Sequence, residues 1–490
     1  MSNDAKQPES TSKPESAEKQ SLEDRGKNRS RTPHSAEFLK YMGSGWADSQ
    51  SRLVDTDDVA AFAAARRAKV AQRFAGKVVV IEAGAAKTRS NDTEYRYRAH
   101  AAFSHLTGWG SATVPDSVLV IDARAASAGE YTGNAPATLF FRPTAGRHTD
   151  EFFANPAIGE FWVGERPNLS QVSALLGIAT RDLADLDGVL AEVSEKGKLT
   201  LADADLAEFV SELRLVKDEY EILEMRKAVA ASALGFENIV RNLERATQHP
   251  RGERIVETAF FAEARANGND LGYETIAASG EHACTLHWII NDGQVKNGDL
   301  ILVDAGVEVD SLYTADITRT LPVNGKFSPI QRKIYEAVRE AADAVFAIAR
   351  PGIQFKELHA AAMQVIAAKT AEWGLLPDGV SAADSLDPEK QYHRRFMVHG
   401  TSHHLGIDVH DCAQARREMY LEGILEPGMV FTIEPGLYFH RDDLLVPEEY
   451  RGIGVRIEDD VLVTVDGVEN LSAGLPRGAD EIEAWMARLR

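Results

Sequence analysis

Apolar positions in the first half of the chain follow two periods, with short continuous runs separated by segments of helical period. Runs of β-branched and other apolar residues predict strands, and apolar residues three or four apart predict helices. The expected strands are residues 78–82, 117–121 and 137–141, and the expected helices are residues 57–74, 171–176 and 205–215. This order predicts an N-terminal α/β domain over residues 36–216. The polar-aromatic segments 92–98 and 103–108 are expected between its strands, as plain surface or as a wall of a site.

Residues 1–35 differ from this pattern. They are rich in Ser, Lys, Glu, Asp, Gln and Pro, and they hold almost no large apolar side chains. Such a segment cannot bury enough apolar surface to offset the entropy lost on ordering. We therefore expect a disordered tail.

From residue 217 onward the helical segments are longer, and antiparallel hairpins separate them. The expected helices are residues 218–244, 253–267, 329–349 and 355–373. Repeated strand and helix segments of this kind predict an α+β domain over residues 217–490, with helices on one side of a curved sheet.

Residues 300–320 predict a hairpin whose two strands each carry a carboxylate. An apolar run ends at Asp304, a turn-rich segment follows, and Asp316 opens the second run. Asp is common in turns, so either residue alone is adequately explained by turn chemistry. The rest of the chain changes this interpretation.

The second domain contains an internal repeat around this hairpin. The segment NGDLILVDAG at residues 297–306 aligns with PGMVFTIEPG at residues 427–436, and both contain a turn Gly, an apolar strand, an acid and a second Gly. A chance likeness of two strands is the alternative. Two copies of one unit, related by a pseudo-two-fold axis, would place Asp304 and Glu434 at equivalent strand ends.

Composition and charge exclude several classes of protein. A hydrophobic content of 44% is ordinary for a globular protein, while a net charge of -21 argues against a nucleic-acid partner and an anionic membrane surface. The two cysteines, Cys284 and Cys412, offer neither a disulfide framework nor a cysteine zinc site. No apolar signal region or membrane-length run is visible, so we expect a cytoplasmic protein without a membrane partner.

Histidines and acids concentrate in the last third of the chain. Four of the 14 histidines lie in residues 399–410, where a functional site is more plausible than four separate structural roles. Residues 454–465 predict one further strand, with Arg456 and Glu458 on the same face because side chains two apart point the same way. We expect Asp459 and Asp460 in a solvated turn.

These observations define a candidate metal site. Its members are Asp304, Asp316, His403, Glu434 and Glu458. Four carboxylates and one imidazole facing one interior would repel strongly unless cations neutralised them. A ligand set rich in oxygen, with one nitrogen, suits Mn, Co or Mg and differs from the thiolate ligands of a cysteine zinc site.

At these residues the chain resembles the M24 metallopeptidases, the pita-bread family, and within it the bacterial Xaa-Pro aminopeptidase (aminopeptidase P) branch. The matching motifs are TLHWIINDGQVKNGDLILVDAG, ADITRTLPVNGKF, HGTSHHLGIDVHD, LEPGMVFTIEPGLY and YRGIGVRIEDDVLVT. DTEYRYRAHAAFSHLTG resembles that branch's N-terminal domain. The resemblance implies an α+β pita-bread catalytic domain with a pseudo-two-fold repeat, preceded by an α/β domain of the creatinase/aminopeptidase P type.

The resemblance also implies a role for each candidate residue. Two divalent ions, usually manganese, would be bound by Asp304 on one side and by His403 and Glu434 on the other, with Asp316 and Glu458 bridging them. His287, His399 and His410 match histidines around the metals and substrate, and Arg456 and Tyr273 match supporting polar residues. Asp92 and Trp162 match residues that approach the site, in some cases from a neighbouring subunit of a dimer or tetramer. The 304–316 loop is one residue longer than the family pattern, and residues 152–160 contain an insertion.

The implied reaction is release of the N-terminal residue from peptides with proline at the second position. A hydroxide bridging the two ions would attack the scissile carbonyl, Glu434 would move the proton, and His410 or His399 would stabilise the oxyanion. Because proline has no N–H and a fixed φ, a site shaped for its ring could reject ordinary peptides.

One alternative function stays open at this point, and three others are disfavoured. Prolidase, an Xaa-Pro dipeptidase, has the same five ligands but would refuse longer peptides. Methionine aminopeptidases normally lack the large N-terminal domain, and creatinase-like amidinohydrolases lack the metal carboxylates. Non-catalytic binding modules with this fold have lost ligands, whereas here the set is intact.

Overall fold

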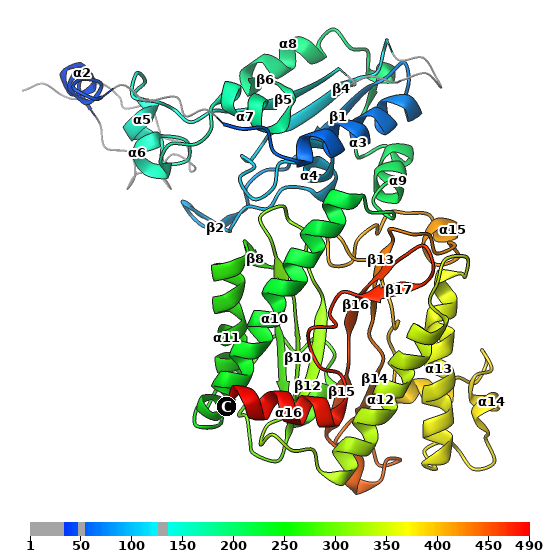
Figure 1. The fold of residues 1–490 in the computed structure, drawn as a ribbon. Coiled ribbons are helices and arrows are strands. Elements are labelled where there is room, and N and C mark those ends of the chain that lie inside the picture. The colour runs from blue at the N-terminus through cyan, green and yellow to red at the C-terminus, as the bar shows by residue number, and fades with distance from the viewer. Residues whose placement is uncertain (1–33, 48–53, 126–135) are drawn as a thin grey trace, which may run out of the picture.

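The chain folds into an N-terminal and a C-terminal domain (Figure 1). The computed structural model describes residues 34–47, 54–125 and 136–490. The predicted tail therefore lies, apart from its last two residues, outside the described part of the chain. No helix in the described ranges is long and apolar enough to cross a membrane.

The N-terminal domain is built on a five-stranded mixed sheet with the strand order β6-β5-β4-β1-β7. Its strands are β1 (Val78–Glu82), β4 (Val118–Asp122), β5 (Ala137–Phe141), β6 (Ala179–Asp182) and β7 (Lys198–Leu199). Its helices are α3 (Val59–Arg73), α4 (Ala101–Thr107), α7 (Leu169–Leu176), α8 (Leu186–Leu190) and α9 (Ala204–Glu212). Alternate residues along β1 enter two different clusters, since Val79 and Ile81 pack with α3, α4, α7 and α9 while Val78 and Val80 pack toward α8.

Small elements project from this domain. They are α2 (Ala36–Met42), the hairpin of β2 (Thr88–Ser90) and β3 (Thr93–Glu94), and the short helices α5 (Glu151–Ala154) and α6 (Glu160–Val163). The insertion at residues 152–160 thus contributes to α5 and α6, which lie beside α2 at the edge of the molecule (Figure 1).

One expectation for the N-terminal domain is wrong. Residues 103–108 are neither plain surface nor the wall of a site, because they form most of the buried helix α4 and its cap. His105 is 1% exposed and lies 3.3 Å from Glu221 of the C-terminal domain, so a long-range partner compensates for the buried polar group. Gly108 ends the helix with φ +76°, a conformation that L side chains rarely adopt.

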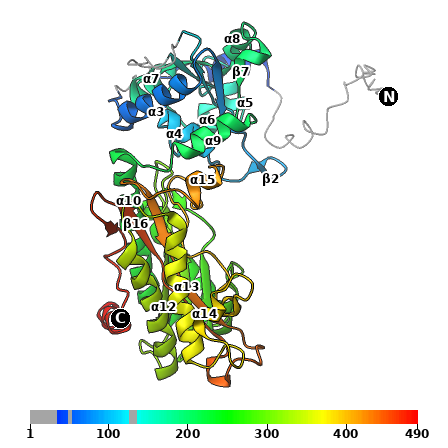
Figure 2. The same ribbon diagram turned by 90° about the vertical axis from the view of Figure 1, so that its right-hand side faces the viewer.

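In the C-terminal domain, long helices pack against short antiparallel sheets, as Figure 2 also shows from the side. The helices are α10 (Glu219–Thr247), α11 (Gly252–Asn267), α12 (Pro329–Ile348), α13 (Phe355–Glu372), α14 (Ala382–Ser385), α15 (Arg417–Tyr420) and α16 (Ala479–Leu489). The strands are β8 (Asp270–Leu271), β9 (Ile276–Ser279), β10 (Leu300–Ala305), β11 (Val307–Glu308), β12 (Ile317–Pro322), β13 (Val430–Ile433), β14 (Gly436–Phe439), β15 (Ile453–Arg456), β16 (Asp459–Val463) and β17 (Val468–Asn470). Capping boxes at Asp218 and Ser328 define where α10 and α12 begin.

The two halves of this domain support the predicted repeat. β10 and β12 form the expected antiparallel hairpin, and β13 pairs with β16. Gly298 and Gly428, which the repeat aligns, precede β10 and β13 with φ values of +95° and +94°. Both turns therefore require the backbone conformation that glycine adopts most readily. The repeat places Asp304 near the end of β10 and Glu434 directly after β13.

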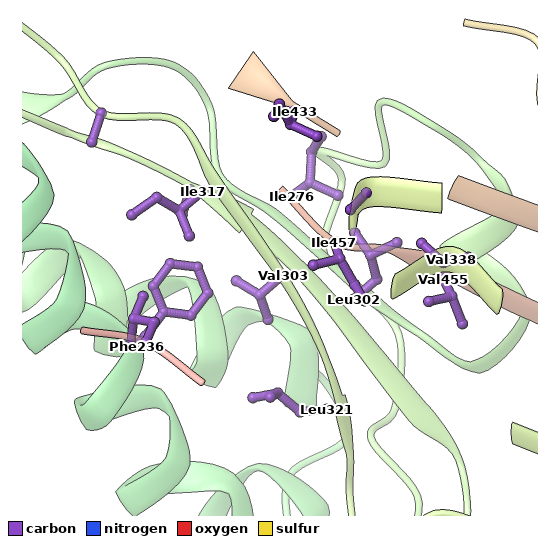
Figure 3. Packing of buried hydrophobic residues seen from close by; sticks show 14 of the residues in the cluster. Phe236, Ile276, Leu302, Val303, Ile317, Leu321, Val338, Ile433, Val455 and Ile457 are labelled. Atoms are coloured by element: carbon purple, nitrogen blue, oxygen red, sulfur yellow. The ribbon is translucent and has the colours of Figure 1, made fainter. Parts of the chain in front are cut away.

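The core of this domain lies where its sheets meet the helices. Figure 3 shows Val303 of β10 and Ile317 of β12 near Phe236 of α10, all of which are completely buried. Val338 of α12 and Val455 of β15 pack into the same cluster. This apolar packing fixes the strands whose ends carry the candidate ligands.

The predicted strand 454–465 is broken, and the solvated-turn prediction for its two aspartates is wrong. β15 ends at Arg456 and pairs with β14, whereas β16 begins at Asp459 and pairs with β13 and β17. Asp459 and Asp460 are both fully buried. Asp459 lies 2.7 Å from Arg319 and 2.8 Å from Arg477, so its charge is balanced inside the domain.

Candidate metal centre

Side chains from five separate segments line one cavity of about 560 Å³ in the C-terminal domain. They are Asp304, Asp316, His403, Glu434 and Glu458. Asp304 belongs to β10, Asp316 directly precedes β12, and Glu458 lies between β15 and β16. Potential ligand atoms of Asp316, His403 and Glu458 all lie within 4.8 Å of one another. The structure thus brings together all five of the predicted ligands.

The orientation of His403 suits a metal ligand. Its Nδ1 lies 3.2 Å from the carbonyl oxygen of His404, which fixes that nitrogen as the donor. Its Nε2 then faces the acids, 3.2 Å from Asp316 Oδ2 and 3.5 Å from Glu434 Oε1. A main-chain acceptor on the remote nitrogen is the usual way in which a protein fixes the tautomer of a metal-binding imidazole.

Two polar side chains orient Asp304 and Asp316. The hydroxyl of Tyr273 donates to Asp304 Oδ1 at 2.6 Å and also contacts Asp316 Oδ1. Arg456 donates from Nη2 to Asp304 Oδ2 at 2.5 Å. Both Tyr273 and Arg456 were predicted as supporting residues, and each lines the cavity.

Three supporting residues were missed at the level of sequence. Thr318 donates to Glu458 Oε2 at 2.7 Å, and the hydroxyl of Tyr438 lies 2.7 Å from His399 Nε2. Asp460 accepts from the main-chain N–H of Asp316 at 3.1 Å. Thr318 lies two residues after Asp316 inside a quoted motif, so a period-two count would have placed it on the site's face. Tyr438 lies on β14, a different strand from the β13 that Glu434 follows, so no such count reaches it.

The electrostatics of the cavity reflect crowded negative charge. Burial raises the pKa of Glu434 to about 7, and burial together with the charges of Asp316 and Glu434 raises the pKa of Glu458 well above its ordinary range. Burial and the charge of Asp304 raise the pKa of Asp316. Burial alone would lower the pKa of His403, but its hydrogen bond to Asp316 and the nearby charges raise it to about 9. The raised pKa values of the three acids mean that their charged forms are unfavourable when no cation is nearby. Divalent cations would neutralise this negative charge, and the donor set fits them.

The remaining predicted residues divide into two groups. His287, His399 and His410 line the same cavity as the acids, and the rings of His403 and His410 lie 4.5 Å apart. Asp92 and Trp162 do not line it within the described single chain. Trp162 is 49% exposed on α6 and donates to Phe153 O at 2.7 Å. An approach of these two residues from a neighbouring subunit therefore stays a prediction.

Known proteins match both domains of the chain. Residues 224–465 match metallopeptidase family M24, and residues 63–201 match the aminopeptidase P N-terminal domain. Xaa-Pro aminopeptidase 1 of Streptomyces coelicolor is 48% identical over 93% of each chain, and Xaa-Pro aminopeptidase 2 of the same organism is 46% identical over 95% of this chain and 99% of its own.

Solved structures agree with these sequence matches. Escherichia coli aminopeptidase P in its low-pH form superposes with a TM-score of 0.74 and 29% identity, covering 89% of this chain and all of that one. A zinc-substituted form in complex with product has a TM-score of 0.73 and 30% identity, covering 88% and 99%. The predicted fold class is confirmed, and the chain belongs to metallopeptidase family M24, with the N-terminal domain of aminopeptidase P preceding its M24 domain.

Proposed function

We propose that this chain is a metal-dependent aminopeptidase that releases the N-terminal residue from peptides with proline at the second position. The observation that carries the proposal is the meeting of four buried or half-buried carboxylates and one oriented imidazole in one cavity. The relatives named Xaa-Pro aminopeptidase, which match across both domains, supply the substrate class.

Membership of family M24 implies divalent metal ions, and we propose manganese, one of the ions that suit an oxygen-rich donor set with one nitrogen. Asp304 would hold one ion, and Asp316 and Glu458 would bind both ions. His403 and Glu434 would complete the coordination of the other ion. The bound ions would supply the acidity that makes a water nucleophilic near neutral pH and would polarise the scissile carbonyl.

The chain's own residues would handle the proton and the developing charge. Glu434, which lies 3.5 Å from both His399 and His403, would accept a proton from the attacking water and pass it to the leaving proline nitrogen. His399 and His410 also line the cavity, and an N–H of either could donate to the carbonyl oxygen as it gains charge. The acids would also attract the free N-terminal ammonium of a peptide.

The cavity combines these polar groups with an apolar wall. Leu286, Ile289, Val409 and Tyr420 line it together with the ligands. Apolar lining with a few convergent polar groups is typical of a site that selects a substrate by shape. A proline ring, which has no N–H to satisfy, suits such a wall.

Matched peptides test both the proline preference and the prolidase alternative. The manganese-loaded protein is assayed with Ala-Pro-Ala-Ala and Ala-Ala-Ala-Ala, and with the dipeptide Ala-Pro. The proposal expects release of Ala from the proline tetrapeptide alone among the two tetrapeptides. Equal rates on both tetrapeptides would refute the proline claim, and cleavage of the dipeptide alone would favour a prolidase.

We further propose a cytoplasmic homo-oligomer, dimer or tetramer. Two buried free cysteines, Cys284 and Cys412, are consistent with a reducing compartment. Trp162 does not line the cavity of its own chain, which is compatible with a role at the cavity of a neighbouring subunit. Light scattering on the purified protein, and fractionation of cells that express it, test these two points, and a monomer or an exported protein would contradict them.

A further inference from the structure

The segment 92–100 of the N-terminal domain carries two arginines that reach the C-terminal domain. Its backbone is anchored on its own domain, since Tyr97 donates from its hydroxyl to Ala83 O at 3.0 Å and His100 N–H donates to the same oxygen at 2.9 Å. Arg96 and Arg98, one position to either side of Tyr97, instead form hydrogen bonds across the domain boundary. The segment therefore presents two cations from a fixed support.

Arg98 binds two different parts of the C-terminal domain at once. Nε donates to Glu308 Oε2 at 2.5 Å, Nη2 donates to Ile407 O at 2.5 Å, and Nη1 donates to Asp408 Oδ1 at 3.0 Å. Glu308 is 3% exposed and also accepts from Asn269 at 2.9 Å, so it is a rigid anchor. All three guanidinium nitrogens donate hydrogen bonds, and the single ammonium group of a lysine could not reproduce this arrangement.

The loop that Arg98 contacts carries His410 of the candidate site. The loop of residues 404–411 begins directly after His403 and includes His410, and both of these histidines line the cavity. Within the loop, Gly406 N–H donates to Asp408 O at 3.2 Å and Asp411 N–H donates to His404 O at 3.0 Å. Beyond His410, Asp411 is fixed at 2.9 Å by Arg214, a second arginine of the N-terminal domain, which acts at the loop's end and not at its tip. Ile407 and Asp408 lie at the tip of the loop, where Arg98 supplies charge-assisted hydrogen bonds from the other domain.

We propose that Arg98 is a positioning residue of the active site, through which the N-terminal domain holds the 404–411 loop and so fixes the place of His410. This inference rests on the proposed function, because it gives His410 a role in the reaction. Arg98 itself does not line the cavity. Its effect passes through Ile407 and Asp408, which lie three and two residues before His410.

Arg96 provides a matched comparison on the same segment. It also crosses the domain boundary, donating to Asp270 Oδ2 at 2.5 Å and to Asn269 O at 3.3 Å, but these contacts are to β8 and its preceding residue and not to the 404–411 loop. If both arginines only held the two domains together, loss of either one would change kcat to a similar extent. If Arg98 positions the loop, loss of Arg98 should lower kcat and loss of Arg96 should not.

Steady-state kinetics separate these two possibilities. Because a displacement of about 1 Å at a catalytic group can cost about 100-fold, Arg98→Ala should lower kcat by about 10- to 100-fold with KM nearly unchanged. Arg96→Ala should stay within about twofold, as expected for an exposed ion pair. Asp408→Ala, which removes one contact from the loop's side and leaves the N-terminal domain intact, should lower kcat in the same direction as Arg98→Ala. Equal losses for Arg96→Ala and Arg98→Ala would overturn the proposal.

A double-mutant cycle asks whether the effect passes through His410. In a His410→Ala background, adding Arg98→Ala should cost less than about threefold, because the group being positioned is already absent. An undiminished loss in that background would mean that Arg98 acts elsewhere, and the proposal would fall.

Hydrogen exchange gives a readout that does not depend on activity. Arg98→Ala should speed exchange of the main-chain N–H groups in residues 404–411, whereas Arg96→Ala should not. Failure of the wild-type chain to cleave Xaa-Pro peptides would sink the proposed function, yet the exchange experiment would still decide whether Arg98 holds the loop. Unchanged exchange in both variants would contradict the positioning role.

Discussion

The carboxylate of Glu253 on α11 holds the loop that forms one wall of the cavity, and its replacement by Gln gives a sharp test of that support. Glu253 is completely buried. Oε1 accepts from Ser279 N–H and contacts His282 Nδ1, each at 2.8 Å, while Oε2 accepts from Trp288 Nε1 at 2.9 Å and from Gly293 N–H at 2.7 Å. These four contacts enclose the loop that carries His287 and Ile289.

Glu253→Gln keeps the shape of the side chain but supplies only one acceptor oxygen. In either orientation of the amide, the main-chain N–H of buried Ser279 or of half-buried Gly293 loses its acceptor, at a cost of about 1–3 kcal/mol, and the other bonds lose their charge assistance. We expect the free energy of unfolding to fall by about 3 kcal/mol, after allowing for the relief of burying a charge. For a domain of this size that corresponds to a Tm decrease of about 6–12 °C.

Thermal and urea unfolding followed by circular dichroism measure this loss. Glu263→Gln on the same helix is the control, because its carboxylate accepts from Asn267 only one turn away, and it should change the free energy of unfolding by less than about 0.5 kcal/mol. We also expect lower kcat/KM in Glu253→Gln, since the His287 loop loses its anchor. A variant that unfolds within about 1 kcal/mol of the wild type would refute the reasoning.

Three further predictions concern the metal site and the buried charges. Asp316→Asn should retain the fold but lose at least one bound ion and nearly all activity, and full activity with two ions, found by metal analysis, would contradict the assignment. Arg319→Met leaves the buried Asp459 with one partner fewer and should reduce the free energy of unfolding by about 3–5 kcal/mol in urea; a loss below about 1 kcal/mol would exclude the role given to this pair. Burial alone would raise the pKa of Asp411, but the charges of Arg214 and Lys217 lower this pKa below its ordinary value. The stability that ionised Asp411 contributes is therefore present above about pH 4 and is lost as pH falls through the folded-state pKa. Unfolding curves between pH 2 and pH 6 should therefore show a weaker acid-side slope for Asp411→Asn, and an unchanged slope would contradict the linkage.

The long helices were predictable because their apolar period is strong. α10, α11, α12 and α13 begin and end within a few residues of the ranges expected from sequence. Their capping residues, such as Ser328 before Pro329, are local signals that need no knowledge of tertiary structure. The hairpin of β10 and β12 was predictable for a similar reason, as its alternating runs are separated by turn residues.

Buried polar residues were harder to predict because their partners are distant in the sequence. Asp459 and Asp460 look like a turn pair, and only the fold brings Arg319 to one and the main-chain N–H of Asp316 to the other. His105 in α4 depends in the same way on Glu221. The contacts of Arg98 span about 310 residues to Asp408, so no local pattern could have indicated them.

Metal counting combined with anomalous scattering tests the central claim most directly. The claim is that Asp304, Asp316, His403, Glu434 and Glu458 together hold a pair of divalent ions. The active protein should contain two ions per chain, both within the cavity that these five side chains line. An active protein that contains no divalent ion, or whose ions lie away from these side chains, would contradict it.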